Sequence, residues 1–135
     1  MSASVELLVG YALVHVALIF LLAGVRFHGV YKGVHQGFRF RVDGEDISPL
    51  AMRVSRAHGN SYENLGMIVA VVVAAGFLGK LNIIEPLAPL VLWARVAQSI
   101  VHVCSVSTPA IVIRFAFFLM QIGTLLYWIV QLFQS

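Results

Sequence analysis

Four polar residues with the spacing of a single helix face lead into an apolar segment of the chain. At ~100° per residue they form one stripe, and the segment that follows, residues 65–78, carries no charge. Polar groups beside hydrocarbon are costly unless they meet one another, a partner helix or a polar ligand. We therefore expect this stripe to face a polar partner. Its members are Arg53, Arg56, Asn60 and Glu63.

A second polar stripe lies in a later apolar segment. Arg95, Gln98 and His102 recur at spacings of three and four residues, which places them on one face of a helix. Arg114 stands about one turn inside the next apolar segment, and Arg26 ends the first one. We expect all of these residues at one level of the protein, together with the first stripe.

With Arg53 left aside, four arginines of these segments stand against one carboxylate, so their charges do not balance. A structural bundle pairs its buried charges roughly one to one, so the surplus predicts a pocket for an anion, and the arginine fork suits a carboxylate. The alternative for Arg26 and Arg114 is that they extend to lipid head groups from helix ends. Arg95 lies deeper, which favours a ligand or helix-bridging role. The other two members of the set are Arg56 and Glu63.

The composition indicates a membrane protein. Of the 135 residues, 60% are hydrophobic and only 11% are charged, whereas a soluble domain carries about 25% charged residues. We predict one transmembrane domain over residues 1–135. The net charge of +3 does not predict nucleic-acid binding, because the basic residues lie near the expected helix ends rather than on a soluble module. Cys104 is the one cysteine, so no intrachain disulfide forms, and no metal site is predicted.

Four apolar runs predict an all-α protein, an integral membrane four-helix bundle with up-down topology. No basic region precedes the first run, so we interpret it as a membrane span rather than a cleaved signal peptide. Ser48-Pro49 and Ser107-Thr108-Pro109 each combine a capping residue with a proline, as at the start of a helix. The expected helices cover approximately residues 4–27, 49–79, 85–105 and 109–133, with a long loop at 28–48.

Basic residues gather around the first loop. Lys32, Arg39 and Arg41 lie within it, and three further arginines flank it. The positive-inside rule therefore predicts that this loop is cytoplasmic, that both termini lie on the non-cytoplasmic side, and that the polar stripes face the cytoplasm. In a bacterium the membrane would be the cell (inner) membrane.

The motif Arg56-Ala-His58-x-Asn60-x-x-Glu63-Asn64 resembles the signature of the membrane-associated proteins in eicosanoid and glutathione metabolism, the MAPEG family. Arg26, Arg95 and the proline turn followed by Arg114 extend the resemblance over essentially the whole chain. It implies a homotrimer of four-helix subunits in the membrane lipid. It also implies that glutathione binds between adjacent subunits and that a lipophilic small-molecule substrate enters from the lipid.

The resemblance also implies roles for single residues. Arg114 takes the position of the arginine that stabilises the glutathione thiolate, and Glu63 is placed to pair with the ammonium group of glutathione. Gln98 and His102 occupy positions of ligand contacts on the third helix. The residues implied to bind or frame glutathione, the co-substrate, are Arg26, Arg56, Asn60, Glu63, Arg95, Gln98 and His102.

Three functions follow from this reading. The first is a glutathione-dependent transferase or peroxidase acting on a lipophilic electrophile. The second is a non-catalytic scaffold of the same fold that binds glutathione or lipid, because Gly59 and Phe118 stand where enzymatic members often have an arginine and a tyrosine. The third is a small transporter or channel subunit, which the absence of an internal repeat and of discontinuous helices disfavours.

Overall fold

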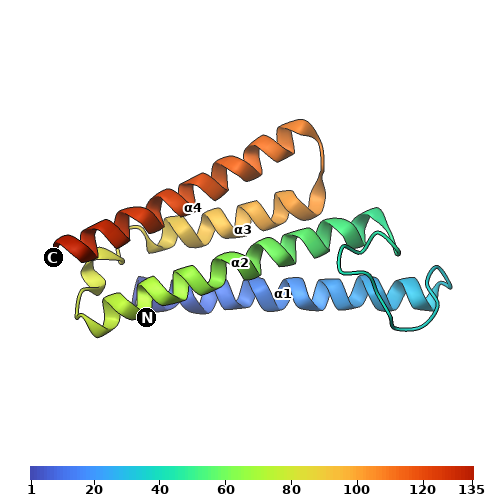
Figure 1. Ribbon diagram of the computed structural model, residues 1–135, viewed down its shortest axis with the longest axis horizontal. Helices are drawn as coiled ribbons and strands as arrows, with labels where there is room; N and C mark the ends of the chain where they lie inside the picture. Colours follow the sequence, from blue (N-terminus) through green and yellow to red (C-terminus); the bar gives the residue numbers. More distant parts are fainter.

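The computed structural model describes residues 1–135, which form four α-helices, one short 3₁₀-helix and no strand (Figure 1). Both chain termini lie at one end of the bundle, and the 32–48 loop and the turn before the last helix lie at the other end. The predicted all-α, up-down bundle is thus confirmed. Its elements are α1 (Ala3–Tyr31), α2 (Pro49–Phe77), η1 (Leu81–Ile83), α3 (Ala88–Cys104) and α4 (Thr108–Gln134).

The outer surface of the bundle is apolar. The helices α1, α2 and α4 are long and apolar enough to cross a membrane, whereas α3 is a shorter apolar helix of 17 residues, or about 26 Å at 1.5 Å per residue. Large side chains such as Phe20, Trp93 and Leu126 are exposed on this surface. Apolar surface on this scale needs lipid rather than water around it, so the chain is an integral membrane protein.

Serine caps open two of the helices at the expected residues. The Ser48 hydroxyl accepts a hydrogen bond from the Ala51 N–H at 3.0 Å, and the Ser107 hydroxyl accepts one from the Ala110 N–H at 3.4 Å. In each case a proline follows within the first turn, where its missing N–H costs nothing.

The third helix starts later than expected, at Ala88 rather than at residue 85. Glu85 lies in the turn before α3 and forms hydrogen bonds with the N-terminus of α1 instead. Its carboxylate accepts hydrogen bonds from the backbone N–H of Ala3 at 2.6 Å, from the N–H of Ser4 at 3.2 Å and from the Ser4 hydroxyl at 2.5 Å. A carboxylate at a helix N-terminus satisfies free N–H groups and meets the positive end of the helix dipole. Glu85 therefore anchors the start of α1.

The first helix is also longer than expected and ends at Tyr31 rather than at residue 27. No proline interrupts it after Arg26, and it ends only before Gly33, whose φ of 70° lies in the left-handed region. Its last turn is held by packing, because Gly29 and Ile47 are both buried and lie against each other. The second helix ends at Phe77, two residues before Gly79, which has φ of 68°.

Arg41 organises the acidic part of the loop between α1 and α2. Its guanidinium lies 2.7 Å from Asp43 and 3.4 Å from Glu45, and its backbone N–H donates to Asp46 at 3.0 Å. The hydrogen bond from Arg41 lowers the pKa of the Asp43 carboxyl below its ordinary value. Asp46 also pairs with His35 at 2.9 Å. The three acidic residues of the loop are therefore occupied by neighbours within the loop.

The apolar core occupies the half of the bundle near the termini. Leu7 and Tyr11 of α1 pack there with Val91 of α3 and with Leu125 and Trp128 of α4. Towards the other end, α4 slopes away from α1 and α2 (Figure 1). The buried polar side chains begin at the edge of this core, so the fold positions them in the half of the bundle nearer the loop.

Candidate functional site

Arg95 is the centre of the polar region and is fully buried in the bundle. Its Nη1 donates a hydrogen bond to Oδ1 of Asn60 at 2.7 Å, which joins α3 to α2 across 35 positions of sequence. Its guanidinium also lies over the ring of Tyr11, 5.0 Å from the ring centre, which adds a cation–π contact from α1. Three helices thus hold this one side chain.

No carboxylate compensates the charge of Arg95. The ion pairs of the chain lie in the loop between α1 and α2, and within the chain the Nε and Nη2 atoms of Arg95 have no hydrogen-bond partner. A buried guanidinium with free donors is expensive, because each lost hydrogen bond to water is unreplaced. The site therefore has the donors and the charge to bind an anionic group.

A chain of hydrogen bonds runs beside Arg95 between α1, α3 and α4. Gln121 donates from Nε2 to Oε1 of Gln98 at 2.9 Å, and the Tyr11 hydroxyl donates to Oε1 of Gln121 at 3.4 Å. All three side chains are buried. Tyr11 is a member of the site that the sequence patterns do not predict. In the sequence, Tyr11 differs from its neighbours by carrying a hydroxyl group within an otherwise apolar span.

His102 and Arg114 meet closer to the loop end of the bundle. Arg114 Nη1 lies 2.9 Å from His102 Nδ1. Because a guanidinium has only donors, Nδ1 accepts this bond and the neutral ring carries its proton on Nε2. The chain therefore brings Arg114 of α4 to the His102 imidazole of α3, close to the loop end of the bundle.

Arg56 and Glu63 are exposed on the outer face of α2. They lie seven residues apart, or about 10 Å along the helix, and neither forms an ion pair within the chain. Arg53, on the same stripe, is turned inwards instead, and its Nε donates to the carbonyl of Val103 at 2.7 Å. The predicted stripe is therefore divided. Arg53 and Asn60 contact α3, whereas Arg56 and Glu63 face outwards.

Arg26 lies on the other side of α2 from this cluster. Its guanidinium stands over the Phe40 ring at 5.3 Å and donates to the Arg41 carbonyl at 3.3 Å. With His58 it lines a hollow between α1, α2 and the loop. His58 stacks on His15 of α1, with ring centres 4.7 Å apart. Within the chain, Arg26 is therefore not brought to Arg95.

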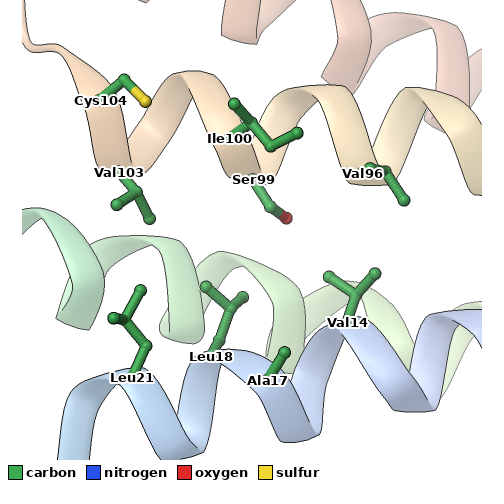
Figure 2. A pocket seen from close by; sticks show the side chains of 9 residues that line it. All are labelled: Val14, Ala17, Leu18, Leu21, Val96, Ser99, Ile100, Val103 and Cys104. Carbon is green, nitrogen blue, oxygen red and sulfur yellow. The ribbon is translucent and has the colours of Figure 1, made fainter. Parts of the chain in front are cut away.

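The larger hollows of the chain are lined by none of the predicted site residues except Arg26. One of them is an apolar groove of about 330 Å³ between α1 and α3, into which Leu18, Ser99 and Val103 point (Figure 2). Ser99 is the one polar residue of its lining, and its buried hydroxyl has no hydrogen-bond partner. This groove lies beside α1, away from the contact of Arg114 with His102 between α3 and α4.

These features define a polytopic helical membrane protein with an arginine-rich polar site inside its bundle. Comparison with protein families matches residues 5–134 to the MAPEG family, and the chain belongs to this family. Comparisons with curated proteins and with solved structures found no match. Membership makes this a membrane protein related to glutathione and eicosanoid metabolism, in a family that includes glutathione transferases and related enzymes.

Proposed function

We propose that this protein is a glutathione-dependent transferase or peroxidase that acts on a lipophilic electrophile from the membrane. The observation that carries the proposal is Arg95, a buried guanidinium whose hydrogen-bond partner is a neutral amide and which keeps two free nitrogens. Glutathione carries two carboxylates, and a carboxylate fits the fork of an arginine. Family membership supports the same ligand.

The remaining polar residues have complementary roles in this proposal. Asn60 orients the Arg95 guanidinium, while Gln98 and His102 offer further hydrogen bonds along the same helix face. Glu63 supplies the negative charge that the ammonium group of glutathione needs, and Arg56 adds a cation for its second carboxylate. A zwitterionic tripeptide would thus meet both signs of charge on one wall.

Arg114 is the proposed catalytic residue. A thiol such as that of glutathione is largely protonated at neutral pH, and a neighbouring guanidinium favours the nucleophilic thiolate. The neutral His102 ring fixes the direction of Arg114 through the 2.9 Å contact without taking its charge. Arg114 would stabilise the thiolate while its sulfur attacks an electrophilic carbon or a peroxide oxygen.

The outward charges of α2 support assembly into a homotrimer. A charge facing the hydrocarbon at the centre of a helix costs at least ~2.5–3.5 kcal/mol, so Arg56 and Glu63 are expected to be covered by protein. In the proposed trimer they meet a neighbouring subunit, and Arg26 of that neighbour completes the glutathione site. The basic loop predicts that this site faces the cytoplasm.

A conjugation assay with glutathione and an aromatic electrophile tests the proposal. Arg114→Ala is expected to lower kcat about 10²-fold or more and to move the pH–rate profile to higher pH, because the thiolate loses its stabilising cation. Arg39→Ala is the matched control, since Arg39 is an exposed loop arginine without an ion pair. Equal turnover of Arg114→Ala and wild type would refute the role of Arg114.

The same assay distinguishes the second candidate function. A Cβ at Gly59 would meet open space, and Phe118 stacks on Phe115 at 6.4 Å, so neither position offers a polar contact. Glutathione binding without turnover in the wild type would favour a non-catalytic scaffold of the same fold. Absence of glutathione binding would contradict both functions.

A further inference from the structure

Two hollows of the chain lie next to each other along α1 and share Leu21 as a lining residue. The groove between α1 and α3 begins at Val14 and reaches Leu21 (Figure 2). A second hollow, of about 460 Å³, lies between the last turns of α1, the loop and the start of α2, and Leu21 lines it too. We call the pair the α1 channel. Its combined size falls in the ~300–1,000 Å³ range of small-molecule sites.

The two parts of the α1 channel differ in chemistry. The groove is lined by apolar side chains apart from Ser99, so it accepts hydrocarbon and nothing charged. The second hollow is lined on its α1 side by His28 and Lys32. Lys32 has no acidic partner, because the loop carboxylates are occupied by Arg41 and His35. The polar end of the channel is therefore cationic.

The dimensions of the α1 channel fit one leaflet of a bilayer. From Val14 to Gly24 the helix rises about 15 Å, which is half of a ~30 Å hydrocarbon core. His28 and Lys32 follow one and two turns later, about 6 and 12 Å further along the axis. The apolar groove thus covers the depth of the acyl chains, and the polar side chains of His28 and Lys32 stand at the level of the head groups.

We propose that the α1 channel binds one anionic phospholipid, with an acyl chain in the groove and the head-group phosphate at Lys32 and His28. The loop beside it is rich in basic residues, as cytoplasmic loops are, and the cytoplasmic leaflet carries the anionic lipids. This site is separate from the proposed glutathione site and does not depend on it.

Native mass spectrometry of the full-length protein, delipidated in detergent, tests the site. The probes are phosphatidylglycerol, phosphatidylcholine with the same acyl chains, and glycerophosphoglycerol, which is the head group without chains. We expect one phosphatidylglycerol per chain, bound about fivefold more tightly than phosphatidylcholine, which is the effect of about one cation near the phosphate. The chainless head group is expected not to bind.

Two variants and two matched controls locate the lipid. Ala17 is exposed and lines the groove, so Ala17→Phe fills the groove without disturbing the core and should abolish lipid retention. Lys32→Gln should lower phosphatidylglycerol binding to the level of phosphatidylcholine. Ala12→Phe, also exposed on α1 but outside the groove, and Lys80→Gln, at the opposite end of the bundle, should behave as wild type.

Three results would overturn the proposal. The first is equal affinity of the wild type for the two phospholipids. The second is retained lipid in Ala17→Phe. The third is loss of the oligomer in Ala17→Phe, which the same spectra report and which would assign the groove to a second copy of the chain. Binding of the chainless head group as tight as that of phosphatidylglycerol would also contradict a role for the groove.

Discussion

Arg95 and Arg114 are each oriented by a side chain that carries no charge. The Asn60 amide accepts from Arg95 at 2.7 Å, and the His102 ring accepts from Arg114 at 2.9 Å. A carboxylate in either position would neutralise the guanidinium and compete with an anionic ligand. Neutral partners fix the geometry and leave the positive charge available, which is what a binding site for a carboxylate or a thiolate requires.

At the same scale, the Gln98–Gln121 hydrogen bond gives a prediction about stability. Gln121→Leu removes the donor to Gln98 and the acceptor of the Tyr11 hydroxyl, so we expect the free energy of unfolding to fall by about 1 kcal/mol. Adding Gln98→Leu should recover part of the loss, because the second unpaired amide is then also removed. Reversible unfolding in mixed micelles measures both variants, and strictly additive losses would argue against the pairing.

At the scale of elements, the loop between α1 and α2 is held on α2 by a close backbone approach. Gly44 has φ of 73°, and a Cβ there would lie 2.8 Å from the carbonyl of Ala51. Gly44→Ala should therefore lower the free energy of unfolding by more than the ~1–2 kcal/mol that a non-glycine residue costs in the left-handed backbone conformation alone. Gly33→Ala is the control, since Gly33 has φ of 70° with open space around it. Equal losses in thermal unfolding would contradict the packing contact.

The anchor of α1 predicts a pH dependence. The hydrogen bond from Ser4 holds the pKa of the Glu85 carboxyl below its ordinary value of 4.5. A carboxyl with a lowered folded-state pKa stabilises the fold above the unfolded-state pKa, and this stability is lost as the pH falls through the folded-state value. Glu85→Gln should therefore have a lower Tm at neutral pH and a smaller loss of Tm below about pH 4.5.

Glu6→Gln provides the control for that experiment. Glu6 stands in the first turn of the same helix and is exposed, and no hydrogen bond reaches its carboxylate. Its variant should follow the wild-type curve of Tm against pH. If Glu85→Gln and wild type lost the same Tm between neutral and acidic pH, Glu85 would not be the anchor.

At the scale of the whole molecule, the separation of Arg26 from Arg95 and Arg114 within one subunit becomes a test of the trimer. In the proposed assembly, Arg26 and Arg114 of one site come from neighbouring subunits. Arg26→Ala and Arg114→Ala homomers should each be nearly inactive in glutathione conjugation. Trimers assembled from both variants in equal amounts should regain about a quarter of the wild-type sites. A site is intact only where one chain still has Arg26 and its neighbour still has Arg114, and random mixing gives this pair at about one interface in four.

Two measurements accompany the complementation experiment. Native mass spectrometry of the purified protein is expected to show three chains per particle. Separately purified variants mixed without subunit exchange are the control and should stay inactive. No recovered activity in mixed trimers, with both homomers properly assembled, would place the whole site within one subunit.

Much of the fold could be predicted from local patterns. The spacing of apolar runs, the serine–proline starts at Ser48 and Ser107, and the low charge content are properties of short segments, and the helices formed where these segments lie. The helix ends were less predictable. Glu85 would suit the start of α3, yet it binds the N-terminus of α1, because that end is close in space and has free N–H groups.

The sequence by itself determined a four-helix membrane protein with two polar helix faces and too few acids for its arginines, because composition and periodicity are local quantities. The tertiary structure alone decided which of these residues meet. It paired Arg95 with Asn60 and Arg114 with His102, brought in Tyr11, and turned Arg26 to the far side of α2. Periodicity fixes the face on which a side chain lies, but the rotation of each helix about its axis is set by packing against the others.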